Sequence, residues 1–468
     1  MEKNVLLIDP FYNGGYVPPN WILGKMEAEL LQDGINVRVI DFVDPSCEIN
    51  NYDYFQKKEN EFIKKILKEI IESKIKVVYI TSSYGIPLKP LPVFPRIIKI
   101  AQKIKSINNQ AKIIVGGAGV TYAARMLGIS FEKIPEKKYI DFFVIGDEEK
   151  SLTLIRRILK LKNIRRNKNY YPQIIWKNWD FKKYPPYISL LTTKGCPYRC
   201  KFCFEHRCFD EYIKYDVINI LDNIKTLIAL RGIDRFAIED STFLAHPQLE
   251  VFLNYLFKEK IRIRFSAYGR VDEVIKRKNL LSKMKKVGCS NLLIGIETPK
   301  NEILEKEGKL ITTHLSLKAV KLLKQNNINI QGCFMLIFPS DSLQDIENTI
   351  EFAYSLNLHF YRWHIFQPNF SSKEIQEILK NKIIPLDYLK VQLNVPDSCL
   401  PDVLEKNPLI ALFDEHCLIR ALPYLRNDKK LLQIKYPNIS FQQAFKLIKE
   451  KLVNKQKSFN EEKNYNLI

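Results

Sequence analysis

Short apolar runs alternate with longer amphipathic stretches through the first 155 residues of the chain. The apolar runs predict strands at residues 5–9, 36–41, 76–81, 112–116 and 140–145. Apolar residues spaced three and four apart predict helices at about 20–33, 56–73, 91–107 and 119–127, with another from residue 148. Strands that do not alternate apolar and polar residues are buried on both faces. The alternation of such strands with helices is typical of a parallel, doubly wound sheet. We therefore expect residues 1–155 to form an α/β domain whose ligand lies beyond the carboxyl ends of its strands.

The same alternation returns between residues 187 and 370, after a linker at 156–186 that is first basic and then aromatic. Six strands are predicted at 187–193, 235–240, 262–267, 291–297, 329–336 and 359–366. Helices are predicted between them at about 211–230, 246–258, 273–287, 313–326 and 342–356. Residues 371–468 are predicted to be mainly helical and to close the open side of this second domain.

The composition narrows the class of protein. A chain of 468 residues is long enough for two or three domains. Its net charge of +21 comes mainly from lysines interleaved with glutamates, a pattern more typical of solvated helix faces than of a nucleic-acid site. There is no signal-peptide pattern and no stretch of about 20 apolar residues. We expect a soluble, cytoplasmic protein that does not enter a membrane and does not act on nucleic acid.

Three of the nine cysteines, Cys196, Cys200 and Cys203, stand close together directly after a predicted strand. Their C-x3-C-x2-C spacing places three thiolates on one loop, where they can hold a single inorganic centre. A [4Fe–4S] cluster bound by three thiolates leaves one iron for a ligand that is not protein. Zinc is the alternative, and it would need a fourth ligand such as His206 or Cys208. The other cysteines are scattered and form no disulfide framework, as expected in the reducing cytosol.

The segment Gly195-Cys-Pro-Tyr-Arg-Cys-Lys-Phe-Cys203 resembles the signature of the radical S-adenosylmethionine (SAM) enzymes. In that family the cysteines bind a [4Fe–4S] cluster, the open iron binds SAM, and one electron cleaves SAM to a 5′-deoxyadenosyl radical. The resemblance implies a partial (β/α)6 barrel with its chemistry at the strand C-termini. It also implies cofactor contacts from Phe202 in the loop and from Glu239, Asp240, Arg270 and Glu297 at the strand ends.

The first predicted domain resembles the cobalamin-binding domain of the cobalamin-dependent radical SAM enzymes. The resemblance rests on glycine-rich and hydroxyl-rich loops after the strands, and implies that they hold cobalamin. The residues concerned are Asp9, Phe11, Gly14, Ser82, Ser83, Gly116, Gly117 and Thr121. Some such domains carry a cobalt-ligating histidine where this chain has Phe11. No histidine precedes His206, so we expect water or no ligand on the lower cobalt face.

Three functions follow from these features. The first is an enzyme that uses SAM and cobalamin to methylate an unactivated carbon of a peptide or natural product. The second is a radical SAM enzyme that epimerises, crosslinks or rearranges a peptide, with a first domain that no longer binds cobalamin. The third is a cobalamin-binding module with a structural cluster. Either enzyme needs a small-molecule or peptide substrate and an electron donor such as flavodoxin or ferredoxin.

Overall fold

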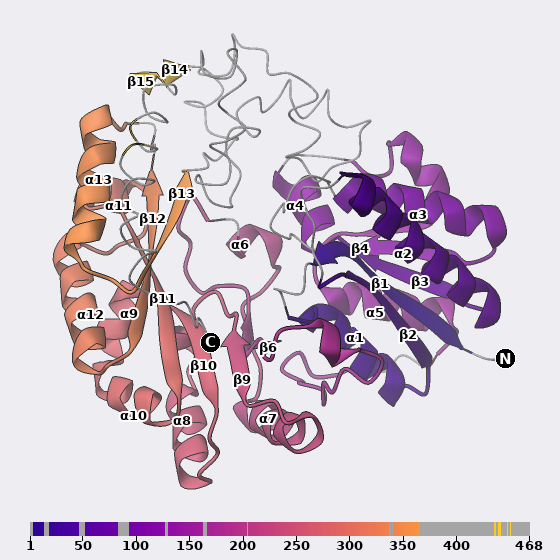
Figure 1. The fold of residues 1–468 in the computed structure, drawn as a ribbon, viewed down its shortest axis with the longest axis horizontal. Coiled ribbons are helices and arrows are strands. Elements are labelled where there is room, and N and C mark those ends of the chain that lie inside the picture. Colours follow the sequence, from indigo (N-terminus) through magenta and orange to yellow (C-terminus); the bar gives the residue numbers. More distant parts are fainter. Residues whose placement is uncertain are drawn as a thin grey trace. The chain divides into compact units, whose positions relative to one another are not determined.

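The structure is a computed structural model. It describes residues 3–13, 18–45, 52–82, 93–126, 130–161, 166–203, 205–336, 338 and 340–365, together with 435–436, 439–440, 447 and 450. The described residues fall into two compact units (Figure 1). The first unit contains those of 1–195 and 204–234, and the second contains those of 196–203 and of 235 onward. The predicted boundaries at 155, 186 and 370 stay a prediction.

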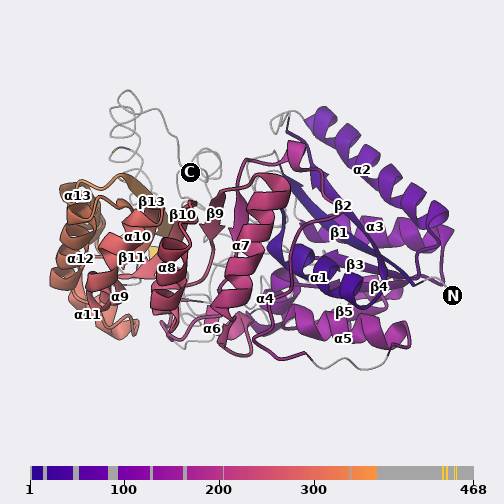
Figure 2. The same ribbon diagram turned by 90° about the horizontal axis from the view of Figure 1, so that it is seen from below.

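The first unit is built on five parallel strands in the order β2-β1-β3-β4-β5. The strands are β1 (Asn4–Asn13), β2 (Asn36–Val43), β3 (Val77–Thr81), β4 (Lys112–Gly116) and β5 (Phe142–Val144). Its helices are α1 (Trp21–Gln32), α2 (Tyr52–Glu72), α3 (Val93–Ile107), α4 (Ala118–Met126) and α5 (Glu148–Ile158). Helices α1 and α5 contact each other on one face of the sheet, and α2 and α3 do so on the other (Figure 2). The predicted doubly wound α/β sheet is confirmed.

Burial explains why these strands could be predicted, and a proline explains why the predicted end of β1 was wrong. Val5, Leu6, Leu7 and Ile8 of β1 are all 0% exposed, as expected for a strand covered on both faces. The prediction ended this strand at residue 9, because Pro10 has no amide hydrogen for a sheet. The strand continues to Asn13, with a register shift against β2 that accommodates the proline.

The second unit repeats the strand–helix pattern with its strands in the order β13-β12-β11-β10-β9. The strands are β9 (Arg235–Ile238), β10 (Arg264–Arg270), β11 (Cys289–Glu297), β12 (Asn329–Leu336) and β13 (Phe360–Ile365). The helices are α8 (Leu249–Lys258), α9 (Val271–Lys276), α10 (Leu281–Lys286), α11 (Asn301–Lys306), α12 (Thr313–Gln325) and α13 (Leu343–Ser355). The helices lie along one side of the curved sheet (Figure 1), as expected for a partial barrel.

Three elements around the cysteines differ from the prediction. The predicted strand 187–193 is divided into β6 (Ile188–Leu190) and β7 (Thr193–Lys194), and β7 pairs antiparallel with β8 (Ile213–Lys214). The predicted helix 211–230 therefore begins later, as α7 (Val217–Arg231), where the Asp216 side chain accepts from the Ile218 amide. A short helix, α6 (Glu205–Cys208), lies between β7 and β8 in the sequence.

The linker aromatics and a small part of the C-terminal region are also described. The linker aromatics pack within the first unit: Trp176 is fully buried against Gly24, and the Trp21 indole donates to the Tyr171 hydroxyl at 3.2 Å. Most of the predicted helical region 371–468 lies outside the described residues. Its described part contains the antiparallel strands β14 (Lys435–Tyr436) and β15 (Ile439–Ser440). Among the helices that the structure describes, none is long and apolar enough to cross a bilayer.

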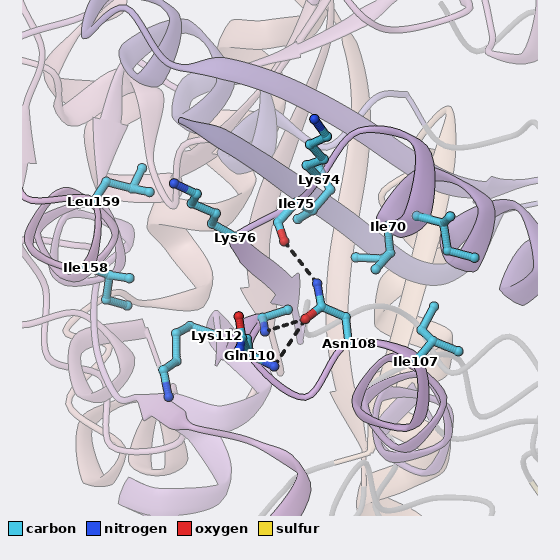
Figure 3. A pocket seen from close by; sticks show the side chains of 12 residues that line it. Ile70, Lys74, Ile75, Lys76, Ile107, Asn108, Gln110, Lys112, Ile158 and Leu159 are labelled. Atoms are coloured by element: carbon cyan, nitrogen blue, oxygen red, sulfur yellow. Dashed lines mark hydrogen bonds between the residues drawn. The ribbon is translucent and has the colours of Figure 1, made fainter. Parts of the chain in front are cut away.

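A depression of about 610 Å³ lies at the edge of the first sheet where β3 and β4 begin (Figure 3). Lys76 and Lys112 line it, together with isoleucines from α2, α3 and α5. The Asn108 side chain also lines the depression. It donates to the Ile75 carbonyl at 3.4 Å and accepts from the Gln110 amide at 3.1 Å. This edge is opposite to the carboxyl ends of the strands, where the predicted cofactor residues lie.

Candidate functional site

The cysteine loop begins directly after β7 and lies within the connection between β7 and β8. Gly195 turns the chain with φ of 77°, and a Cβ atom there would lie 2.9 Å from the Glu211 carbonyl oxygen, so only glycine fits without displacement. Cys200 is buried, whereas Cys196 and Cys203 are partly exposed. The Cys203 amide donates to the Cys200 carbonyl at 3.1 Å, which closes a tight turn inside the loop. The sequence therefore folds these residues into a short turn bearing three thiols.

The described cysteines form no disulfide. In the described part of the chain, no three Cys, His, Asp or Glu side chains converge on a position for one metal ion.

Arg270 joins the cysteine loop to the carboxyl end of β10. Its Nη1 donates to Cys200 Sγ at 3.2 Å, and its Nη2 donates to the Lys309 carbonyl at 2.6 Å. The guanidinium also lies over the Tyr198 ring, 3.8 Å from its centroid. Burial lowers the pKa of Arg270, but Asp272 and then Cys200 outweigh burial and raise it. A permanent cation therefore touches one of the three thiols.

Glu297 and Lys309 form a second buried group beside the loop. Lys309 Nζ lies 2.6 Å from Glu297 Oε1 and 5.7 Å from the centroid of the Phe202 ring. Burial lowers the pKa of Lys309, but Glu297 and then Cys200 raise it above its usual value. Glu297 has a positive φ of 68°, and its carboxylate lies so close to Gly295 that a Cβ there would clash. Lys309 carries no motif, and sequence reasoning missed it.

The predicted pair Glu239 and Asp240 follows β9. Asp240 is fully buried. Burial raises the pKa of Tyr268 on β10, and the nearby Glu239 carboxylate raises it further while Arg362 opposes both. The ends of β9, β10 and β11 thus carry all four strand-end residues that the sequence predicted.

In the first unit, one turn brings together four of the predicted cofactor residues. Ser82 Oγ donates to the Gly116 carbonyl at 2.9 Å and accepts from the Val120 amide at 2.8 Å. Thr121 Oγ1 donates to the Gly117 carbonyl at 3.0 Å. Gly117 has φ of 105°, and a Cβ atom there would lie 3.1 Å from Thr81 Oγ1 and 3.2 Å from the Ser82 carbonyl oxygen. The result is a glycine turn at the carboxyl ends of β3 and β4, tied together by hydroxyls.

The remaining first-unit candidates lie at the end of β1. Asp9 accepts from the Phe11 amide at 3.1 Å and from the Asn20 side chain at 3.0 Å. Burial raises the pKa of Asp9 to about 6, although both hydrogen bonds lower it. Phe11 is partly exposed and lies within β1 rather than in a loop after it. Gly14 and Ser83 lie outside the described residues.

The cations around the cysteine loop give a first prediction. Arg270→Gln removes the donor to Cys200 but keeps much of the side-chain volume, so we expect the iron content after reconstitution to fall. Residues that support metal ligands typically change affinity by roughly 10- to 100-fold, and the rate of iron loss to a chelator should rise by a similar factor. Arg264→Gln, at the exposed start of the same strand, is the control. If Arg270→Gln and Arg264→Gln retained iron equally well, the contact of Arg270 with Cys200 would not support iron binding.

Asp341 gives a prediction about pH. Burial raises the pKa of Asp341 to about 6. The hydrogen bond from the Phe338 amide at 2.8 Å and the Lys300 ammonium group at 3.6 Å both lower it, but by less. The folded chain therefore binds this proton more tightly than the unfolded chain, whose aspartate pKa is 3.8. The stabilisation is full below pH 3.8 and is lost as the pH rises through about 6.

Asp341→Asn mimics the protonated carboxyl at every pH. It should raise the free energy of unfolding at pH 7.5 by roughly 1–3 kcal/mol, with a smaller gain at pH 5. Urea unfolding at both pH values measures this difference. A variant less stable than the parent at pH 7.5 would show that the charge of Asp341 is needed there.

Comparisons with known proteins agree with this geometry. Residues 190–353 match the Radical SAM superfamily. An uncharacterised methyltransferase of Pyrococcus horikoshii is 25% identical in an alignment 298 positions long that covers 58% of this chain and 63% of that protein. The matched part is thus less than two thirds of that relative's length.

Two solved structures share the fold. The radical SAM methyltransferase TsrM from Kitasatospora setae, with cobalamin and a [4Fe–4S] cluster, aligns with a TM-score of 0.62 at 16% identity over 82% of this chain and 80% of its own. The cobalamin-dependent SAM radical enzyme OxsB, with aqua-cobalamin, aligns with a TM-score of 0.58 at 17% identity. That alignment covers 88% of this chain and 56% of OxsB. Residues 190–353 thus match the radical SAM superfamily in sequence, and the chain shares its fold with TsrM and OxsB.

Proposed function

We propose that the chain is a radical SAM enzyme that methylates an unactivated carbon of a peptide or natural-product substrate with the help of cobalamin. The observation that supports it most directly is the contact of Arg270 with Cys200, beside the buried Glu297–Lys309 pair. Thiolates that bind iron–sulfur clusters carry negative charge, and buried charge needs a partner. Two buried cations next to a three-cysteine loop fit an anionic [4Fe–4S] cluster.

The residues of the second unit would divide the work of binding. Cys196, Cys200 and Cys203 would hold the cluster, which supplies one electron for the cleavage of SAM when it is bound. Glu297 would accept from the ribose hydroxyls of SAM, since a carboxylate has only acceptors to offer. Lys309 holds that carboxylate in place, and the acidic pair Glu239–Asp240 would face the SAM amino group. Asp240 and Glu297 are buried, which would limit the access of water to the SAM groups that they face.

The first unit would bind cobalamin at the turn from Gly116 to Thr121. At Gly117 a Cβ atom would lie 3.1 Å from Thr81 Oγ1 and 3.2 Å from the Ser82 carbonyl oxygen, so glycine lets the turn pack closely against the end of β3. This turn lies beyond the carboxyl ends of parallel strands, where such sheets bind ligands. With Phe11 at the position where other domains place a histidine, the lower face of the cobalt would meet water or no ligand.

Anaerobic reconstitution tests the proposal as a whole. The expected protein contains about four irons and cleaves SAM to 5′-deoxyadenosine under a strong reductant. It also binds hydroxocobalamin, and with substrate it transfers a methyl group from labelled SAM. An acidic flavodoxin or ferredoxin is the proposed physiological reductant, because the chain carries a net charge of +21. SAM cleavage and full turnover without cobalamin would favour the alternative, a cobalamin-free peptide-modifying enzyme.

A further inference from the structure

Lys194, two residues before Cys196, is held by an acidic group at the start of α5. Its Nζ donates to both carboxylate oxygens of Glu148, at 3.1 and 3.0 Å, and lies 3.6 Å from Asp147 Oδ2. The side chains of Lys194 and Glu148 are only 1% and 3% exposed. A two-point, buried ion pair of this kind fixes the lysine side chain in one position.

The charge of Glu148 is secured from a second side. Lys25 Nζ lies 3.3 Å from its carboxylate and 2.8 Å from that of Glu29. Burial alone would raise the pKa of Glu148, but Lys194 and then Lys25 hold it at about 2. The carboxylate is therefore ionised at neutral pH and bridges two buried ammonium groups. Loss of its charge would leave Lys194 with Asp147 alone.

The residues that follow the cysteine loop are anchored to the same part of the first unit. Arg125 of α4 donates to the Cys208 carbonyl at 3.1 Å and pairs with Asp210, and Lys150 of α5 lies 2.9 Å from Asp210. The amide of Gly146, two residues before Glu148, donates to Thr121 Oγ1 at 2.9 Å. The start of α5 thus supports both flanks of the cysteine loop and also the glycine turn.

We propose that Glu148 is a positioning residue for the iron–sulfur centre. By holding Lys194, it fixes the backbone on one side of the Gly195 turn and so determines where the Cys196 thiolate stands. The residue acts through Lys194 and is not itself a ligand. This inference rests on the proposed function, because it requires that the three cysteines bind a cluster.

The test compares Glu148→Gln with a matched control in the same unit. Asp33 is also a buried carboxylate between two cations, with Arg156 Nε at 2.8 Å and Arg166 Nη2 at 2.7 Å, and it does not contact Lys194. Asp33→Asn therefore removes the same charge from a similar setting. Each reconstituted protein is mixed anaerobically with an iron chelator, and the release of iron is followed by absorbance. The EPR spectrum of the reduced cluster is recorded with and without SAM.

Glu148→Gln is expected to lose iron roughly 10- to 100-fold faster than the parent, as for other residues that orient metal ligands, and to alter the EPR spectrum. Glu148→Asp keeps the charge and should restore part of the retention. Asp33→Asn should lower the unfolding temperature but keep the parent rate and spectrum. Equal rates and spectra in Glu148→Gln and Asp33→Asn would overturn the proposal.

A second variant covers the case in which the single replacement does not fold. Glu148→Gln combined with Lys194→Met removes both charges of the buried pair, and such double replacements are often tolerated. It should fold and still release iron fast, because the anchor of the loop is absent; parent-like retention would also overturn the proposal. A parent protein that binds no cluster would instead refute the proposed function.

Discussion

Replacing Cys196, Cys200 or Cys203 with alanine is expected to reduce the iron content from about four per chain to nearly none. Each residue would supply one thiolate, and an alanine methyl group cannot ligate iron. Reductive cleavage of SAM should disappear together with the iron. Iron analysis, the absorbance of the reconstituted protein and chromatographic detection of 5′-deoxyadenosine measure the two effects separately.

Cys289→Ala is the matched control for these variants. Cys289 is fully buried in β11, and burial raises the pKa of its thiol to about 12, so it is protonated and inert at neutral pH. Its loss should leave iron content and SAM cleavage unchanged, apart from some loss of stability. A chain lacking all three loop cysteines that still cleaves SAM would refute the assignment of the cluster.

Gly117→Val is expected to abolish most cobalamin binding while SAM cleavage by the reconstituted cluster continues. The new side chain meets Thr81 and Ser82 at contact distances too short for it, and the positive φ adds backbone strain. Overpacking and left-handed strain together cost roughly 2–5 kcal/mol of folding free energy, so the turn is expected to shift away from the conformation that would bind cobalamin. Titration with hydroxocobalamin, followed by absorbance, measures the change.

The control for Gly117 is a glycine that also has a positive φ but has no atom near its Cβ position. Gly34 has φ of 72°, and a Cβ atom there meets nothing within 4 Å. Gly34→Val should therefore lose stability but keep cobalamin affinity. In the parent protein, the Co(II) state should give an EPR spectrum without splitting from an axial nitrogen. A clear nitrogen signal, or parent-like affinity in Gly117→Val, would show that the turn does not hold cobalamin as proposed.

The sequence predicted the elements of both α/β units well, because apolar runs are buried wherever a parallel sheet is covered on both faces. It failed where local signals competed. Pro10 is a strong signal for the end of a strand, yet a register shift carries β1 past it. The stretch from 187 to 193 has no charged residue, glycine or proline to interrupt a strand, yet Thr193 leaves it to pair with Lys214.

The candidate site shows the same division. The cysteine spacing is local, so the loop could be read directly from the sequence. The contacts of Lys309 and Glu148 could not be read in this way, since each depends on a partner that is distant in the sequence. Lys309 meets Glu297 twelve residues away, and Glu148 meets Lys194 forty-six residues away. A signal that could have pointed to Lys309 is its place beside Gly308, whose φ is positive.

The way the chain passes between the units has a consequence for how the protein is made. Residues 196–203 belong to the second unit, whereas their flanks on both sides belong to the first. Synthesis runs from the N-terminus, so both flanks have been synthesised by residue 234, before β10 exists. Folding of the first unit then brings the two ends of the cysteine loop together. The entropy cost of ordering the loop is therefore no longer part of the free energy of iron binding. Arg270 and Lys309 arrive later. We therefore expect a nascent chain to present its thiols early and to retain iron only after residue 309 has been added.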